Sequence, residues 1–120
     1  MPLHELRTTD GRVVEVVNPG IHNHDAGPDF FNAKVKIDGQ LWVGNVEVHV
    51  HSSDWHRHHH DSDEAYQNVI LHVVSEADCE VCYPNDPDKK IPQLVVRVPD
   101  FVLQNYDELR VPTCSLVVGM

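Results

Sequence analysis

Residues 31–51 read FNAKVKIDGQLWVGNVEVHVH, and this stretch decides the fold. Up to Ile37 apolar and polar residues alternate, which is typical of a strand that is buried on one face only. Asp38-Gly39 then matches a two-residue hairpin turn. We therefore expect residues 40–51 to return as a second strand, antiparallel to the first.

The returning strand also alternates between two kinds of face. Val46, Val48 and Val50 fall on one face, and we expect all three to be buried. The opposite face, which we expect to be solvated, carries polar and titratable residues only: Asn45, Glu47, His49 and His51. The hairpin thus predicts both a core face and a face on which chemistry can be placed.

The rest of the chain supplies further strands and one helical stretch around this hairpin. Strands are expected at 12–17, 69–74 and 94–98, loops at 21–30 and 78–90, and a helical turn at 106–110. A helical element is expected within 53–68, where Asp61 and Glu64 have capping-box spacing. The pattern predicts an α/β (α+β) domain with a mixed central sheet, in which 69–74 and 94–98 flank the hairpin and 53–68 crosses one face.

Size and charge limit the function. The 120 residues of the chain are enough for a single domain, and no apolar run is long enough to cross a membrane. Residues 1–11 lack the pattern of a secretory signal, so we expect a soluble, cytoplasmic protein. Nine basic residues against nineteen acidic ones give a net charge of −10, which opposes binding of nucleic acid by phosphate neutralisation alone.

The last ten residues carry apolar side chains without an evident partner. Leu116-Val117-Val118 is the clearest group among them. We therefore expect the chain to be a fragment of a longer protein and to self-associate as a homo-oligomer.

A pair of carboxylates is the first candidate site. Asp29 follows Pro28 just before the first strand of the hairpin, and Glu47 lies within the second, so the hairpin is expected to bring the two together. Clustered carboxylate oxygens suit Mg²⁺ or Mn²⁺, and His49, on the same face as Glu47, would orient an attacking water. Pro28-Asp29 and Glu47-Val48-His49 resemble the signature of the PD-(D/E)XK nucleases, with His49 where lysine usually stands.

That resemblance implies a restriction-endonuclease-like core and a metal-dependent phosphodiester hydrolase that acts on nucleic acid. Asp29, Glu47 and His49 would then be the catalytic residues, with Lys36 or Lys34 supplying the missing cation. Because His49 lacks the fixed charge of lysine, a catalytically inactive binding or assembly module of the same fold is the alternative.

Ten histidines form the most unusual feature of the composition. His49, His51, His58 and His60 form a second candidate site, which would hold Zn²⁺, Fe²⁺ or Mn²⁺. The competing interpretation is that the histidines hydrogen-bond to nearby aspartates. His72 interrupts the apolar strand at 69–74 and is expected to be a satisfied core histidine; the alternative is that it closes a polar network beneath the site.

Three cysteines are too few and too scattered for a disulfide framework. Cys79 and Cys82 have the spacing of half a zinc knuckle, but a complete site would need Cys114 and a histidine to converge on them. We expect Cys79 and Cys82 to be free or adventitiously bridged cysteines in a loop.

A longer set of motifs is similar to one known family. The motifs are Gly27-Pro28-Asp29-Phe30, Trp42-Val43-Gly44-Asn45-Val46-Glu47-Val48-His49, Ser53-Asp54-Trp55, His58-x-His60, Asp63, Tyr66 and Val69-Ile70-Leu71-His72-Val73-Val74. Together they resemble the DUF2851 family of uncharacterised bacterial proteins, of Bacteroidetes type, over roughly residues 6–114. Members of that family are longer at both ends, and the resemblance implies a fold and a candidate site rather than a reaction.

Overall fold

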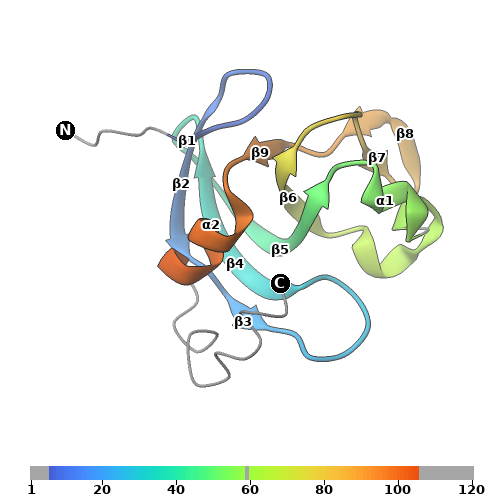
Figure 1. Ribbon diagram of the computed structural model, residues 1–120, viewed down its shortest axis with the longest axis horizontal. Helices are drawn as coiled ribbons and strands as arrows, with labels where there is room; N and C mark the ends of the chain where they lie inside the picture. The colour runs from blue at the N-terminus through green and yellow to red at the C-terminus, as the bar shows by residue number, and fades with distance from the viewer. Residues whose placement is uncertain (1–5, 59, 106–120) are drawn as a thin grey trace.

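The computed structural model describes residues 6–58 and 60–105 of the chain, which form a mixed α+β domain made mostly of strands (Figure 1). The main sheet contains, in spatial order, β1 (Leu6–Arg7), β2 (Val13–Asn18), β4 (Phe30–Ile37), β5 (Gln40–His51), β6 (Val69–Glu76) and β9 (Gln93–Val95). β3 (Ile21–His22) pairs with β4 at one side of this path. A separate hairpin consists of β7 (Cys82–Tyr83) and β8 (Asp86–Lys90).

The sheet is mixed and curls until its two ends nearly meet. Pairing is antiparallel from β1 to β5, whereas β5, β6 and β9 run parallel to one another. Just after β1, Thr8 forms a bridge with Leu94 of β9, and the amide of Thr9 donates to the carbonyl of Gln93 at 2.9 Å. The domain is therefore close to a closed barrel, and a PD-(D/E)XK core remains a prediction from the motif.

The hairpin predicted at residues 31–51 is confirmed and is formed by β4 and β5. β5 spans Gln40–His51 as expected, and Asp38 and Gly39 form the turn with φ angles of 52° and 83°. Asp38 also ties the turn to β2, because its side chain accepts from the amide of Val13 at 2.8 Å. Both central residues have the positive φ that a type I′ turn requires.

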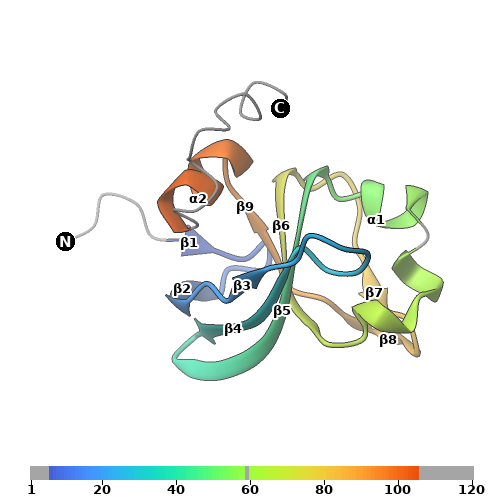
Figure 2. The same cartoon turned by 90° about the horizontal axis from the view of Figure 1, so that it is seen from below.

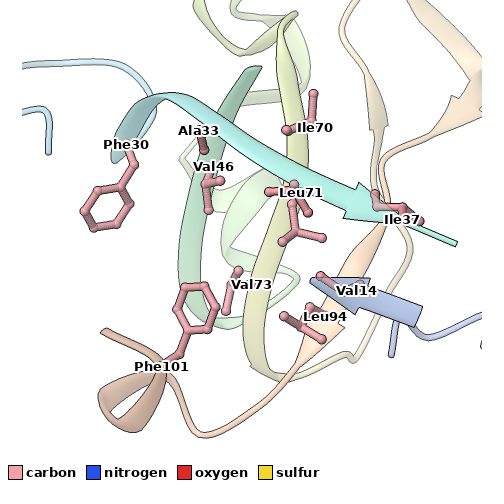
Figure 3. Close-up of a cluster of buried hydrophobic side chains, with 11 residues drawn as sticks. Val14, Phe30, Ala33, Ile37, Val46, Ile70, Leu71, Val73, Leu94 and Phe101 are labelled. Carbon is pink, nitrogen blue, oxygen red and sulfur yellow. The ribbon is translucent and has the colours of Figure 1, made fainter. Parts of the chain in front are cut away.

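The main core lies inside the curled sheet (Figure 3). It comprises Val14, Phe30, Ala33, Val35, Ile37, Val46, Ile70, Leu71, Val73, Leu94 and Phe101. Phe101 belongs to α2 (Val98–Asn105), a helix that the sequence pattern did not predict, and the helical turn expected at 106–110 lies outside the described residues. The strand expected at 94–98 ends at Val95, and Pro99 near the start of α2 suits the first turn of a helix.

The three valines predicted to be buried on β5 differ in their burial, and only Val46 is fully buried. Val46 is buried and Val48 packs against the core, but Val50 is 55 % exposed. Pairing of β4 with β5 extends only to Val46, so beyond this point β5 is paired with β6 alone and lies at the margin of the sheet. The alternation is correct, and the length of the covered region is what the pattern overestimated.

A second, smaller core lies on the outer side of the sheet. Trp55, Tyr66, Val69, Val81 and Ile91 form it. The two views place this side, with the β7–β8 hairpin and α1 (Asp54–Arg57), across β5 and β6 from α2 (Figures 1 and 2). The loop predicted over 78–90 is thus wrong, because its backbone pairs as the β7–β8 hairpin that covers this core.

The segment that connects β5 to β6, here called the crossover segment (residues 52–68), crosses the outer face as predicted. It is built from three short helical pieces: α1, then η1 (His60–Ser62) and η2 (Glu64–Tyr66). The cap of η2 is Asp63, whose side chain accepts from the amide of Ala65 at 2.9 Å. No helix among the described residues has the length and apolar character needed to cross a membrane.

Candidate metal centre

Three polar side chains form a row across the outer face of the sheet. Glu47 of β5 pairs in register with His72 of β6, which pairs with Gln93 of β9. All three are buried, with Glu47 only 4 % exposed. The solvated face expected at Glu47 is therefore wrong, because the crossover segment lies over it.

Asp29 and Glu47 are neighbours that contact each other through backbone amides, and a β-bulge is what aligns them. From Gln40 to Gly44 the hairpin keeps one register, which if continued would place Phe30 opposite Glu47. The register shifts between Phe30 and Ala33, so Phe30 pairs with Val46 and Asp29 lies opposite Glu47. The Asp29 amide donates to Glu47 Oε1 at 3.1 Å, and the Val48 amide donates to Asp29 Oδ2 at 2.8 Å.

The second oxygen of Glu47 faces two histidines. Glu47 Oε2 lies 3.1 Å from Nε2 of His49 and 3.0 Å from Nε2 of His60. His49 comes from the same strand, two residues on, and His60 comes from η1 in the crossover segment. One buried carboxylate thus connects the sheet to the segment that covers it.

His58 completes a group of three imidazoles, here called the histidine cluster (His49, His58 and His60). One ring nitrogen of each lies within 4.8 Å of those of the other two. His58 follows α1 directly and is exposed, whereas His60 is buried and His49 is partly buried. His51, the fourth histidine of the predicted site, is not in this group and instead lies 3.3 Å from Glu76.

Aromatic packing holds His60 in place. Its ring stacks on Tyr66 with centroids 3.7 Å apart, and it meets the edge of Trp55 at 5.3 Å. Trp55 and Tyr66 belong to the outer core, so the apolar packing of the crossover segment positions a polar ligand. In the sequence Tyr66 stands out only as part of a family motif, because its distance along the chain from His60 does not indicate that the two rings stack.

Behind the histidine cluster, polar contacts continue into the sheet. Nδ1 of His49 lies 2.8 Å from Nε2 of His72, and Nδ1 of His72 lies 3.0 Å from Oε1 of Gln93. The Gln93 amide nitrogen donates to the carbonyl of Cys79 at 2.9 Å. The polar network considered for His72 is present, but Gln93 was missed, because a lone glutamine beside a short strand carries no motif.

Burial and neighbouring charges shift the pKa values of these groups in different directions. Burial, then the charge of Glu47, raises the pKa of Asp29 above its ordinary value. Burial also acts to raise the pKa of Glu47, but hydrogen bonds from His49 and His60 outweigh it and hold that pKa low. Burial, then the neighbouring His49, lowers the pKa of His72 to about 4, so its imidazole is neutral near pH 7.

The remaining predicted site residues lie elsewhere. Lys36 is exposed and pairs with Leu41, six residues before Glu47 on β5 and therefore roughly 20 Å away along the strand. Lys34 pairs with Val43 and is also exposed. Cys79 and Cys82 are free thiols, and Cys114 lies outside the described residues.

Fold and site together define a small mixed-sheet protein with a histidine-rich polar centre under a crossover segment. The family model described as "Protein of unknown function (DUF2851)" matches residues 1–116, and the chain belongs to this family. Comparisons with curated proteins and with solved structures found no match.

Proposed function

We propose that the protein binds a single transition-metal ion of the Zn²⁺ type through the histidine cluster, with Glu47 Oε2 as the fourth donor. The observation that carries this proposal is the convergence of one nitrogen from each of His49, His58 and His60 within 4.8 Å. These ligands come from two elements, β5 and the crossover segment, so the bound ion would fasten the two together.

The spacing of the donors supports a tetrahedral ion. With metal–ligand bonds of about 2.0 Å, two ligand atoms of a tetrahedral zinc site lie about 3.3 Å apart. Glu47 Oε2 is 3.1 Å from His49 Nε2 and 3.0 Å from His60 Nε2, which is already close to this spacing, whereas the three imidazole nitrogens, within 4.8 Å of one another, would draw closer around an ion. Three imidazoles and one carboxylate also favour Zn²⁺ over Mg²⁺, which prefers oxygen ligands.

The charge balance of the centre supports the same proposal. A carboxylate only accepts hydrogen bonds, so the contact between Glu47 and His49 Nε2 needs either a proton or a cation between the two atoms. The same holds for His60 Nε2. A divalent ion would satisfy all three atoms, and it would displace the protons that otherwise occupy these contacts.

Competition with a chromophoric chelator would measure the Zn²⁺ affinity, and Co²⁺ substitution would report the coordination geometry by its visible spectrum. His58→Ala should weaken Zn²⁺ binding by at least tenfold, because it removes one of the proposed ligands. The fold should be unchanged, because the His58 side chain is exposed. His51→Ala is the matched control, because His51 lies on the same strand as His49 but outside the cluster. Equal loss in both variants, or no binding by the unaltered protein, would contradict the proposal.

A second candidate function is the metal-dependent nuclease, which the meeting of Asp29 and Glu47 favours. The Asp29 amide and the Glu47 carboxylate are in contact, and Asp29 has a raised pKa beside that charge. A Mg²⁺ or Mn²⁺ ion held by the two carboxylates would activate water for attack on a phosphodiester. The net charge of −10 opposes contact with nucleic acid, and Lys36 lies far along the strand, so this candidate ranks below zinc binding.

Incubation of single- and double-stranded DNA and RNA with the protein and Mn²⁺ or Mg²⁺ tests the nuclease directly. Cleavage that Asp29→Asn abolishes and His51→Ala leaves unchanged would support it. No cleavage, together with no Zn²⁺ binding, would favour the non-catalytic binding or assembly module.

A further inference from the structure

A chain of buried groups behind the histidine cluster sets the orientation of one ligand. Gln93 and His72 are 4 % and 0 % exposed, respectively, so neither exchanges its hydrogen bonds with water. They connect the backbone of the loop after β6 to the ring of His49 through three contacts of 2.8 to 3.0 Å. His49 in turn reaches Glu47 with its other nitrogen.

The carbonyl of Cys79, at one end of this series of hydrogen bonds, determines the direction of each of them. The carbonyl of Cys79 only accepts, so the Gln93 amide must present its NH₂ group there and its oxygen to His72. That oxygen also only accepts, and Nδ1 of His72 must therefore carry the proton. His72 is fully buried, and its ring nitrogens contact a glutamine oxygen and an imidazole rather than a carboxylate, so nothing compensates a second proton on it. Its Nε2 is then a lone pair, and Nδ1 of His49 must donate to it.

We propose that Gln93 and His72 are positioning residues that hold His49 with its proton on Nδ1, so that the Nε2 lone pair of His49 is directed at the metal ion. This inference rests on the zinc site proposed above. In the other tautomer, the lone pair of His49 Nδ1 would face the lone pair of His72 Nε2 at 2.8 Å, and His49 would have no hydrogen bond to hold its ring in this orientation. The hydrogen bond on one imidazole nitrogen decides which nitrogen is free to bind metal.

Comparison with Leu94 distinguishes the hydrogen bonding of Gln93 from a purely structural contribution to β9. Leu94, the next residue on β9, is fully buried in the inner core and faces away from the histidine cluster. Substitution at Leu94 disturbs the same strand without touching the hydrogen-bond chain. A purely structural role for Gln93 would make the two positions equivalent for metal binding.

The test compares Gln93→Leu with Leu94→Val. Gln93→Leu should lower the Zn²⁺ affinity about 10- to 100-fold, whereas Leu94→Val should lower stability and leave the affinity unchanged. NMR of ¹⁵N-labelled imidazoles in the metal-free protein should find the His72 proton on Nδ1 in the unaltered protein and in Leu94→Val, and a change of tautomer population in Gln93→Leu.

A second pair of variants keeps the test decisive if Gln93→Leu does not fold. The amide of a glutamine at position 72 extends about as far as imidazole Nε2 and can accept from His49. His72→Gln should therefore bind Zn²⁺ more tightly than His72→Leu, which offers no acceptor. Circular dichroism would establish that each variant is folded before its affinity is measured.

The outcomes distinguish this inference from the function on which it rests. Absence of Zn²⁺ binding by the unaltered protein would overturn the zinc site itself. Tight Zn²⁺ binding that Gln93→Leu leaves unchanged, or a His72 proton found on Nε2, would overturn the positioning role and leave the zinc site standing.

Discussion

Glu47 makes contacts through both carboxylate oxygens, and all of them are with groups that are at least partly buried. Oε1 accepts from the amide of Asp29, while Oε2 faces His49 and His60. Glu47 is 4 % exposed, so water cannot take the place of its carboxylate as the acceptor for these groups. Its role is structural even before an ion binds, because it links β5, the residue before β4 and the crossover segment.

This leads to a prediction for two variants. Glu47→Ala should lower the free energy of unfolding by about 1–3 kcal/mol, because it leaves buried donors without an acceptor. Glu47→Gln, which keeps an acceptor oxygen, should lose less. Urea denaturation of the metal-free proteins measures both, and equal stability of Glu47→Ala and the unaltered protein would show that the carboxylate is solvated after all.

The sequence singled out residues that the structure brings together, but it did not predict what surrounds them. Glu47 and His49 were singled out by strand alternation, and Asp29, His58 and His60 by residue type and short motifs, all of which depend on local sequence. Gln93 was not, because its role comes from the parallel pairing of β6 with β9 and no local pattern encodes that pairing. The burial of Glu47 was not predicted for the same reason. His60, one of the residues that cover it, follows 13 positions later, beyond the reach of a local pattern.

Among the elements, the bulge in β4 decides whether the two carboxylates face each other. Asn32 lies within the register shift and has a φ of 58°, and its amide donates to the side chain of Asn45 at 3.3 Å. Asparagine tolerates this left-handed conformation better than most residues, and β-branched residues adopt it rarely.

We therefore expect Asn32→Val to destabilise the protein by about 1–2 kcal/mol and Asn32→Gly to be close to neutral. Valine would favour a regular β4, in which Phe30 rather than Asp29 would lie opposite Glu47. Urea denaturation gives the stabilities, and amide chemical shifts of Asp29 and Val48 report whether their mutual contacts survive. A neutral Asn32→Val with unchanged shifts would show that the bulge is held by other contacts.

Prediction of the elements succeeded where turn chemistry is local and failed where pairing is not. Asp38-Gly39 and the alternation around it were sufficient to place β5 residue for residue. The bulge at Asn32 leaves the apolar alternation from Ala33 onward intact, so it has no signature in the pattern. The β7–β8 hairpin forms from exposed residues including Asp86 and Lys90, whose low strand propensity is overridden by backbone pairing over the outer core.

For the molecule as a whole, a bound ion should act as a cross-link. Its ligands would lie on β5 and on the crossover segment, so binding would favour the folded state over the unfolded chain. Zn²⁺ at about a hundred times its dissociation constant should add about 2.7 kcal/mol to the free energy of unfolding. Thermal unfolding with and without Zn²⁺ measures this effect.

Two comparisons identify the origin of such a shift. At that Zn²⁺ concentration His58→Ala should gain at most about half of this stabilisation, because its affinity is at least tenfold lower, and His51→Ala should show the same rise in Tm as the unaltered protein. Mg²⁺ should have little effect on Tm, because the proposed donors are mainly imidazoles. An equal rise with Mg²⁺ would favour the carboxylate pair over the histidine cluster.

The near-closure of the main sheet bears on the order in which the chain folds. The contacts that close the sheet join Thr8 and Thr9, near the start of the described residues, to β9, near their end. The β4–β5 hairpin, in contrast, joins two strands that are neighbours in sequence. Bringing distant segments together costs loop entropy before any contact is made, so the hairpin is the natural early event and the seam a late one. The proposed histidine ligands lie on β5 and in the crossover segment, and neither element forms part of this seam. An ion could thus be captured by a partly folded chain, before the first and last strands have met.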